Sequence, residues 1–169
     1  PKALTILIRG GTEHVVDEVE RAVRDALGDV AATLKDSKIV AGGGAIEIEV
    51  SKRLKEFAKT LTGRERLAIE EFASAMEFVP VTLAENAGLD PIDVLTELRA
   101  VHDSGMKYFG LNLFKDKIED NLVNGIIEPL RVKSQAVSSA TEVAIMILRI
   151  DDVIAAKKLG SKHSNKLGN

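Results

Sequence analysis

The chain of 169 residues suits one domain, or one domain with an arm, and its 45% of apolar residues is enough to build a core. The charged residues are of both signs and give a net charge of −3, so the overall charge favours neither a nucleic-acid partner nor a membrane surface. The lack of cysteine excludes disulfides and thiolate metal sites and agrees with a reducing, cytoplasmic setting.

The chain opens on a short apolar segment, residues 4–8, which is rich in β-branched side chains and is followed by Gly10 and Gly11. This pattern predicts a buried strand. Helical patterns dominate the rest of the chain, and a lone strand cannot satisfy its backbone groups without partners. Two alternatives stay open: the strand pairs with short strands later in the chain, or its partners lie outside this sequence.

Apolar residues at helical spacing predict a first helix from Thr12, its N-cap, to about Lys35. Asp25 lies about 200° round this helix from the apolar stripe, at about 3.6 residues per turn. Its carboxylate therefore points away from the helix's own buried face. Asp25 is either a solvated surface carboxylate or a group that a moving helix brings to a site from outside.

Three further helices are predicted in the middle of the chain. The first runs from Ala45 to about Leu61, and the second is kinked or split by Pro80. The third starts at Asp90 and Pro91, as N-cap and first residue, and reaches about His102. We expect Gly88 to be the left-handed residue that closes the preceding helix.

The end of the chain predicts a short strand or hairpin over residues 108–113 and a last helix from Pro129 to about residue 159. Residues 143–148 are apolar on all sides of that helix, so we expect them to be buried in the domain centre. As the longest apolar run, they are far too short to span a bilayer. The polar residues 160–169 predict a disordered tail. The fold class is therefore mainly α with a few short strands.

The glycine triplet 42–44 lies between a short extended segment, residues 39–41, and a helix. Such a turn lets the backbone approach a ligand closely, and the helix start offers unpaired N–H groups and a positive dipole, an arrangement typical of nucleotide sites. Neither a Walker phosphate loop nor a GxGxxG motif is present. A hinge between two domains is the alternative.

Glu128 occupies the N-cap position before Pro129, although glutamate is not a favoured cap. Either its carboxylate binds another group, for example the hydroxyls of a ligand, or glutamate is a tolerated substitution at this position. The histidines His14, His102 and His163 are scattered without the spacing of metal ligands, and we expect them at the surface.

Four groups of residues together resemble group II chaperonins over nearly the whole chain: 6–21, 40–45, 83–91, and 128–133 with 147–154. The resemblance implies the C-terminal segment of one subunit. Residues 1–11 would end the apical region, residues 12–41 would complete the intermediate domain, and residues 42–159 would form the helical C-terminal part of the equatorial domain, before the tail. The family hydrolyses ATP with magnesium to fold proteins inside two stacked rings.

The resemblance also implies roles for single residues. Asp25 matches the aspartate that orients or activates the attacking water. The nucleoside would be held by five residues: the glycines of the turn, the pair that faces adenine, and the acceptor of the ribose hydroxyls, namely Gly42, Gly43, Asn112, Leu113 and Glu128. The family's phosphate-binding Gly-Asp-Gly-Thr-Thr loop and its magnesium-binding aspartate do not occur in this sequence, so no metal ligand is expected among these residues.

The partners that the resemblance implies are other chaperonin subunits in a double ring and unfolded client proteins held by the apical domain, with no nucleic acid and no membrane. A non-enzymatic alternative stays open. In it, the chain is an autonomous helical fragment that self-associates and has no ATPase activity alone.

Overall fold

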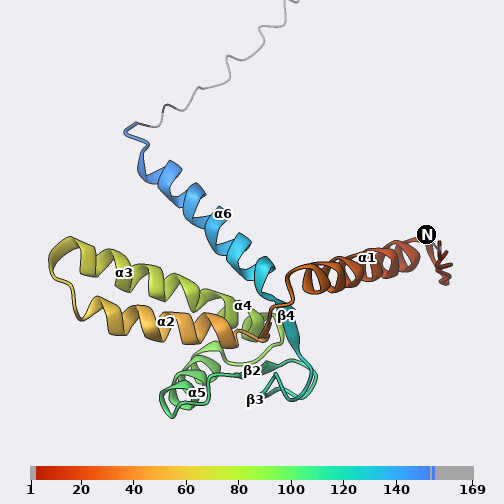
Figure 1. The fold of residues 1–169 in the computed structure, drawn as a ribbon, viewed down its shortest axis with the longest axis horizontal. Helices are drawn as coiled ribbons and strands as arrows, with labels where there is room; N and C mark the ends of the chain where they lie inside the picture. Colours follow the sequence, from red (N-terminus) through yellow and green to blue (C-terminus); the bar gives the residue numbers. More distant parts are fainter. Residues whose placement is uncertain (1–2, 153, 155–169) are drawn as a thin grey trace, which may run out of the picture. The chain divides into compact units, whose positions relative to one another are not determined.

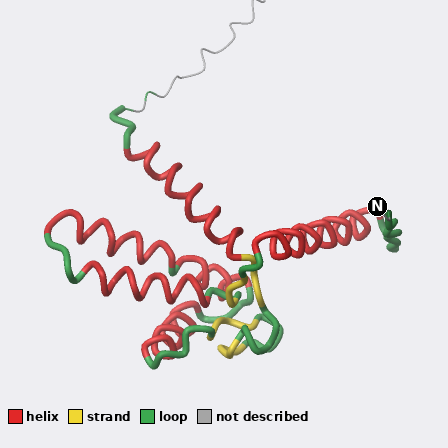
Figure 2. Tube along the Cα trace, in the orientation of Figure 1, coloured by secondary structure: helices red, strands yellow, loops and turns green. Residues whose placement is uncertain are grey.

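The structure is a computed structural model of the chain that describes residues 3–152 and 154. This part of the chain is mainly helical, as predicted, with short strands between long helices (Figures 1 and 2). Residues up to Ser134 form one compact unit and the residues from Gln135 onward form another, and each is described by itself.

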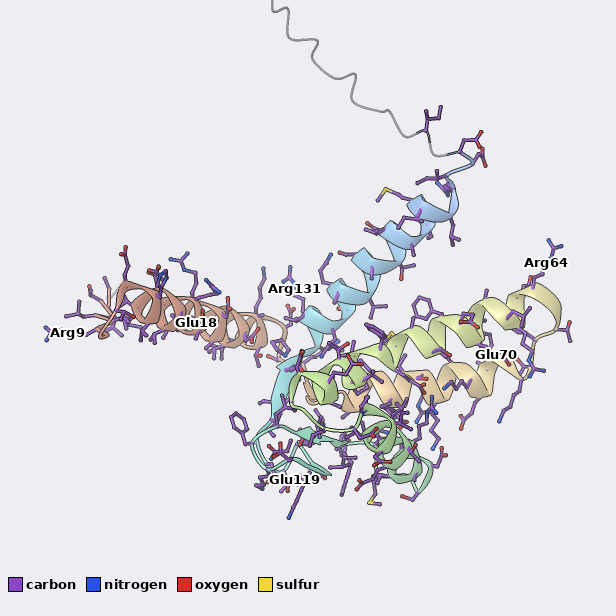
Figure 3. All side chains as sticks on the ribbon, turned by 180° about the vertical axis from the view of Figure 1, so that it is seen from behind. Arg9, Glu18, Arg64, Glu70, Glu119 and Arg131 are labelled. Carbon is purple, nitrogen blue, oxygen red and sulfur yellow. The ribbon has the colours of Figure 1, made fainter. Side chains whose placement is uncertain are left out.

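The first helix, α1 (Glu13–Asp36), confirms the predicted bounds. The Thr12 hydroxyl accepts a hydrogen bond of 3.4 Å from the Val15 amide, as an N-cap does. At the other end Ser37 adopts a left-handed conformation and donates its N–H to the Thr33 carbonyl. No residue of α1 is buried, and side chains such as Glu18 stand out around it (Figure 3).

Residues 3–10 form no strand, so the predicted N-terminal strand is wrong for this chain. Leu4 is 88% exposed and Leu7 is 72% exposed. The physical reason is the lack of a partner, because the four strands of the described chain pair only with one another. The alternative that this segment pairs with the later strands is thereby contradicted.

The helices α2 (Ala45–Ala58) and α3 (Gly63–Met76) are connected by a short loop and lie side by side (Figure 1). Glu77 separates α3 from α4 (Phe78–Asn86), and Pro80 lies in the first turn of α4. The predicted split is confirmed, and it falls where the proline ring causes no loss of a helical hydrogen bond.

The helix α5 (Pro91–Asp103) begins as predicted. The Asp90 carboxylate accepts hydrogen bonds from the amides of Ile92 and Asp93, at 2.8 and 3.3 Å. The prediction for Gly88 is confirmed too, because it follows the C-cap of α4 with a φ of 73°, a conformation that glycine adopts without steric cost.

Four short strands form two separate antiparallel pairs. The short strand predicted over residues 108–113 is confirmed as β2 (Phe109–Asn112), and it forms a hairpin with β3 (Lys117–Asp120), a strand beyond the predicted range. The other pair joins β1 (Ile39–Ala41) to β4 (Ile127–Pro129), with Val40 opposite Glu128. This second pairing brings two distant parts of the chain together and places Glu128 beside the turn that follows β1.

The last helix, α6 (Leu130–Leu148), ends earlier than the sequence predicts. Residues 143–148 are apolar, as the sequence shows, but the predicted burial is not found within their own unit, where Val143 is 49% exposed and Leu148 is 85% exposed. The expected end of the helix near residue 159 and the expected tail, residues 160–169, lie outside the described residues.

The buried apolar core is small and consists largely of alanines, which let helix backbones approach closely. Its members are Ala41, Ala45, Ala58, Ala73 and Ala84, with Ile48, Leu98 and Leu111. Ala41, Ala45 and Leu111 lie on β1, α2 and β2 next to the glycine turn, and the other core residues lie on the packed helices α2, α3, α4 and α5. Among the described residues, no helix combines the length and apolarity that crossing a membrane requires.

Candidate functional site: a glycine turn beside Glu128

The glycine turn after β1 is fixed from both sides by backbone hydrogen bonds. The Gly42 amide donates to the Ile126 carbonyl at 2.9 Å, next to β4. On the other side the Leu111 amide of β2 donates to the Gly43 carbonyl at 2.8 Å. The buried Asn121 side chain adds a hydrogen bond of 3.0 Å from Nδ2 to the Gly42 carbonyl. The turn is therefore a rigid junction between both strand pairs and α2.

Gly43 is required for this close approach. Its φ is 68°, and a Cβ there would collide with the Leu111 carbonyl and with the Asn121 amide group. Gly110 on the opposing strand shows the same tight contact, since a Cβ on it would collide with the Gly42 carbonyl. The backbones of the turn and the hairpin thus lie in direct contact.

Glu128 lies on β4 with its carboxylate directed at the turn. Its Oε1 atom would be 3.0 Å from a Cβ on Gly42, so a larger residue there would press on this carboxylate. The Oε2 atom lies 2.7 Å from Nζ of Lys133. The side chain is 34% exposed, and within the described part of the chain Oε1 accepts no hydrogen bond. One carboxylate oxygen is therefore available to a ligand at the glycine turn.

Lys133 holds Glu128 in place and was not predicted from the sequence. Its Nζ also lies 2.7 Å from Oε1 of Glu47, a buried residue in the first turn of α2. Burial alone would lower the pKa of Lys133, but the carboxylates of Glu128 and Glu47 outweigh it and raise the pKa above its usual value. Lys133 therefore stays charged between the two glutamates. The Oε2 atom of Glu47 is buried without a hydrogen-bond partner in the described structure.

The predicted adenine-facing residues lie at the end of β2, where Asn112 is the last residue of the strand and Leu113 follows it. Asn112 is buried, with its amide donating to Glu119 and its Oδ1 atom accepting from the Phe114 amide at 2.9 Å. The pKa of Glu119 is lowered, first by its hydrogen bond from Lys115 and second by the hydrogen bond from the Asn112 side chain. Leu113 is 44% exposed. The structure thus places Asn112 one residue from the Leu111 contact with Gly43, while its side chain is occupied within the hairpin.

Asp25 is not part of this cluster in the described structure. It is exposed, in the middle of α1, eleven residues before the end of the helix at Asp36, which is about 16 Å along the axis. Asp36 lies 3.7 Å from Arg131 in the first turn of α6, so the C-terminal end of α1 contacts the segment that follows Glu128. The structure brings together Gly42, Gly43 and Glu128 and leaves Asp25 apart.

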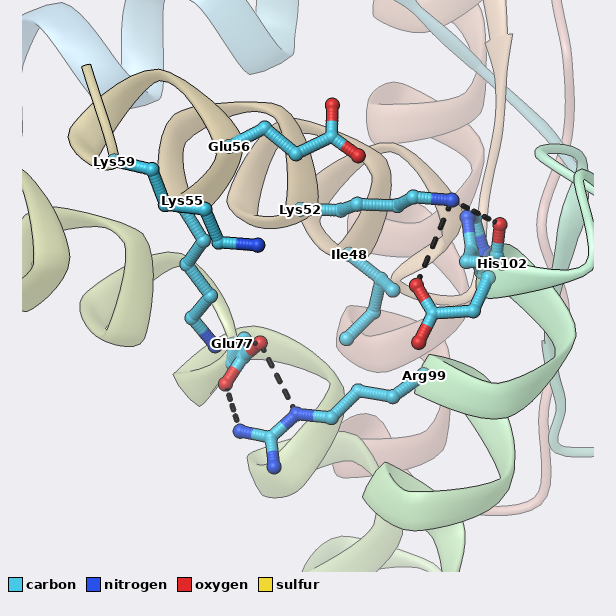
Figure 4. A pocket seen from close by; sticks show the side chains of 9 residues that line it. Ile48, Lys52, Lys55, Glu56, Lys59, Glu77, Arg99 and His102 are labelled. Carbon is cyan, nitrogen blue, oxygen red and sulfur yellow. Dashed lines mark hydrogen bonds and ion pairs between the residues drawn. The ribbon is translucent and has the colours of Figure 1, made fainter.

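A second polar cluster surrounds Glu77, in a cavity of about 220 Å³ (Figure 4). Ser51 and Lys55 of α2 donate to Oε1 of Glu77 at 2.8 and 2.6 Å, and Arg99 of α5 binds both carboxylate oxygens. Burial would raise the pKa of Glu77, but these donors outweigh it and hold the pKa below its usual value. Glu77 in turn raises the pKa of Arg99, mainly through the hydrogen bond between them.

His102 corrects the expectation that the histidines lie at the surface. It is 1% exposed, and both ring nitrogens have partners: Glu49 at 3.1 Å and the Phe109 carbonyl at 2.9 Å. The apolar spacing of α5 carries no sign of this, because a buried histidine is recognised only once its partners are known. His14 is exposed as expected, and His163 lies outside the described residues.

The glycine turn offers a ligand one carboxylate oxygen, Oε1 of Glu128, which can accept hydrogen bonds from hydroxyl groups. Over the described ranges, no group of three or more His, Asp or Glu side chains could hold a metal ion. The expectation that magnesium is bound by residues outside this sequence stays a prediction.

The comparisons with known proteins agree on one family. The model of the TCP-1/cpn60 chaperonin family matches residues 1–158. A thermosome subunit of Methanopyrus kandleri is 62% identical over 94% of this chain and 29% of its own length. A thermosome subunit beta of Methanothermobacter thermautotrophicus is 63% identical over 95% of this chain and 30% of its own. The chain thus spans about three tenths of the length of these curated relatives.

A solved structure supports the same assignment. The open-state monomer of a group II chaperonin from Methanococcoides burtonii matches with a TM-score of 0.71 and 54% identity, over 83% of this chain and 35% of that one. The family model, the curated relatives and the solved structure all match most of this chain, and all are chaperonins or their subunits. The chain therefore belongs to the TCP-1/cpn60 chaperonin family, within its group II branch.

Proposed function

We propose that this chain is the C-terminal segment of a group II chaperonin subunit and provides the nucleoside side of its ATP site. The observation that carries the proposal is Oε1 of Glu128, which accepts no hydrogen bond from the described residues and lies against the glycine turn, 3.0 Å from the position of a Cβ on Gly42. The sequence predicts Glu128 as a helix cap, but the structure places it in strand β4, one residue before Pro129, and α6 begins at Leu130. From this strand its carboxylate can accept hydrogen bonds from vicinal hydroxyls.

The proposed domain organisation follows the resemblance. Residues 1–11 end the apical region, residues 12–41 belong to the intermediate domain, and residues 42–159 belong to the equatorial domain. The long helix α1 followed by β1 and the glycine turn agrees with a junction at residues 41–42. The many exposed apolar side chains, such as Leu4 and Leu148, agree with further parts of a subunit covering them.

In this proposal each residue has a separate task. Glu128 accepts hydrogen bonds from the ribose hydroxyls, and Lys133 keeps its carboxylate in place. Gly42 and Gly43 let the backbone approach the nucleoside, and Asn112 and Leu113 lie near the adenine. Asp25 orients or activates the attacking water after a movement that brings α1 to the nucleotide. ATP supplies the phosphoryl group whose hydrolysis drives the folding cycle.

The wider activity is proposed from the family. The complete subunit would be an ATP hydrolase that assembles with other subunits into a double ring in the cytoplasm and folds client proteins. Phosphoryl transfer requires charge neutralisation by metal and donors, which the residues of this chain do not provide. The chain alone is therefore expected to hydrolyse no ATP. A calorimetric titration of the chain with ATP and magnesium should detect weak binding at most, and submicromolar affinity would contradict the proposed division of the site.

The two carboxylates should affect different kinetic constants in a full-length subunit that contains this segment. Asp25→Ala should lower kcat about 10²- to 10⁴-fold with nearly unchanged ATP affinity, because it acts only on the reacting water. Glu128→Ala should raise KM with a smaller effect on kcat, because it holds the ribose equally in ground and transition states.

Steady-state ATPase kinetics of the two variants, with Asp29→Ala on the same helix as a control for Asp25, test this assignment. Asp29 is exposed on α1 like Asp25. If Asp25→Ala instead raised KM and spared kcat, Asp25 would be a solvated surface carboxylate and the assigned role would be wrong.

A further inference from the structure

His102 connects three elements around the glycine turn and has no role in the site described so far. It lies near the end of α5, and its side chain is completely buried. Nδ1 lies 3.1 Å from Oε2 of Glu49 on α2, and Nε2 lies 2.9 Å from the carbonyl of Phe109, the first residue of β2. One imidazole ring therefore joins α2, α5 and β2.

The partners determine which ring nitrogens carry protons. A carbonyl oxygen can only accept, so Nε2 must donate to Phe109. Glu49 is a carboxylate: burial would raise its pKa, but His102 and Arg53 outweigh burial and hold the pKa below its usual value. Arg53 donates to the other oxygen of Glu49 at 2.9 Å. The Glu49 carboxylate lies at Nδ1 on the other side of the ring and orients it, so that Nε2 faces the Phe109 carbonyl.

The charged groups around His102 keep this ring in place. On α2, Lys52 donates to the His102 carbonyl at 2.6 Å and lies 3.5 Å from Asp103, as Figure 4 shows. Glu49 and Arg53 come from the same helix, and β2 contributes only the Phe109 carbonyl. The one ionised partner of the ring is therefore Glu49, and the ring's second bond goes to the hairpin backbone.

The hairpin transmits the position of Phe109 to the glycine turn. Two residues after Phe109, the Leu111 amide donates to the Gly43 carbonyl at 2.8 Å. Between them, Gly110 is in tight contact with the Gly42 carbonyl. Because the backbones are already in contact, a shift at Phe109 must move the turn or break the Leu111–Gly43 hydrogen bond.

We propose that His102 is a positioning residue for the nucleoside site, which holds β2 against the Gly42–Gly43 turn by donating Nε2–H to the Phe109 carbonyl while Glu49 orients the ring. The effect on nucleotide binding rests on the function proposed above. The effect on the hairpin does not, and the two can be measured separately.

The unaltered chain gives the first test. In a long-range proton–nitrogen NMR spectrum of the ¹⁵N-labelled chain at neutral pH, Nε2 of His102 should carry a proton, with the exposed His14 as internal reference. A His102 ring without a proton on Nε2 would overturn the proposal, since no hydrogen bond to Phe109 could then form.

Three variants separate the hydrogen bond from simple packing. The amide of His102→Gln can take the place of Nε2 and keep the bond to Phe109. His102→Asn reaches only the position of Nδ1, and His102→Leu fills the volume without a donor. Exchange of the Leu111 amide should accelerate about two- to tenfold in the Asn and Leu variants, as expected for the net value of one hydrogen bond, and stay near the unaltered rate in the Gln variant.

Unchanged exchange of the Leu111 amide in His102→Leu would overturn the proposal, whatever His102→Asn shows, because packing alone would then hold the hairpin. In the full-length subunit, His102→Leu should raise KM for ATP about two- to tenfold and spare kcat. Faster Leu111 exchange with unchanged KM would support the role of His102 in the hairpin and contradict the proposed nucleoside site.

Discussion

Glu77 and Glu128 are both glutamates that bind a lysine, but their surroundings differ. Glu77 receives hydrogen bonds from Ser51, Lys55 and Arg99, and its side chain is only 6% exposed. Glu128 is held by Lys133 on one oxygen, is 34% exposed, and directs its other oxygen at a glycine turn. A carboxylate whose acceptor positions are filled by the protein stabilises the fold, whereas one with a free oxygen beside an opening can serve a ligand.

The glycine turn offers the largest expected effect on stability. Gly43→Ala should lower the free energy of unfolding by about 3 kcal/mol, since it combines an unfavourable φ with a collision against the Leu111 carbonyl. Gly88→Ala is the matched control: its φ is also positive, but a Cβ there meets nothing within 4 Å. Urea unfolding of both variants measures the difference, and equal losses would show that the turn and hairpin do not need their close contact.

Glu77→Gln should cost about 2 kcal/mol of unfolding free energy, because hydrogen bonds to a charged acceptor are lost while Lys55 and Arg99 can turn to water. Glu56→Gln, on an exposed residue that lines the same cavity, should change stability little. In the full-length subunit, Glu77→Gln should leave the affinity for ATP unchanged. A loss of ATP affinity larger than that of Glu128→Gln would reverse the contrast between the two carboxylates.

The pH dependence of stability should separate Glu77 and Glu49 from ordinary carboxylates. Both have a folded-state pKa below the usual value of 4.5, so their contribution is fully present above about pH 4.5 and is lost as the pH falls through the lowered pKa. Unfolding free energies measured from neutral pH to pH 3 should therefore decrease with acid, and the decrease should be smaller in Glu77→Gln. An equally steep decrease in that variant would contradict the assigned ion pairs.

Features set by local chemistry could be predicted from the sequence. The caps at Thr12 and Asp90, the left-handed Gly88 and the split near Pro80 depend on a few neighbouring residues, and all are confirmed. The hairpin of β2 and β3 belongs to the same class, because its strands follow one another directly.

Features that depend on distant partners could not be predicted. Lys133 and Glu47 are far apart in the sequence, and the burial of His102 depends on Glu49 and Phe109. The apolar residues 143–148 lead to the opposite error, since an apolar pattern predicts burial without naming what covers it. Of the candidate site, the pairing of β1 with β4 unites Gly42, Gly43 and Glu128, while Asp25 stays an expectation from the resemblance.

The central claim is that the free oxygen of Glu128 binds the ribose hydroxyls of ATP. The most direct measurement is a thermodynamic cycle in the full-length subunit that combines one protein change with one ligand change. The affinities for ATP and for 2′,3′-dideoxy-ATP are measured in the unaltered protein and in Glu128→Gln. The exposed Glu85→Gln on α4 serves as control. Calorimetry should give a loss of about 1–3 kcal/mol for Glu128→Gln with ATP and almost none with the dideoxy nucleotide. Equal losses with both nucleotides would show that Glu128 acts on something other than the ribose and would contradict the proposed site.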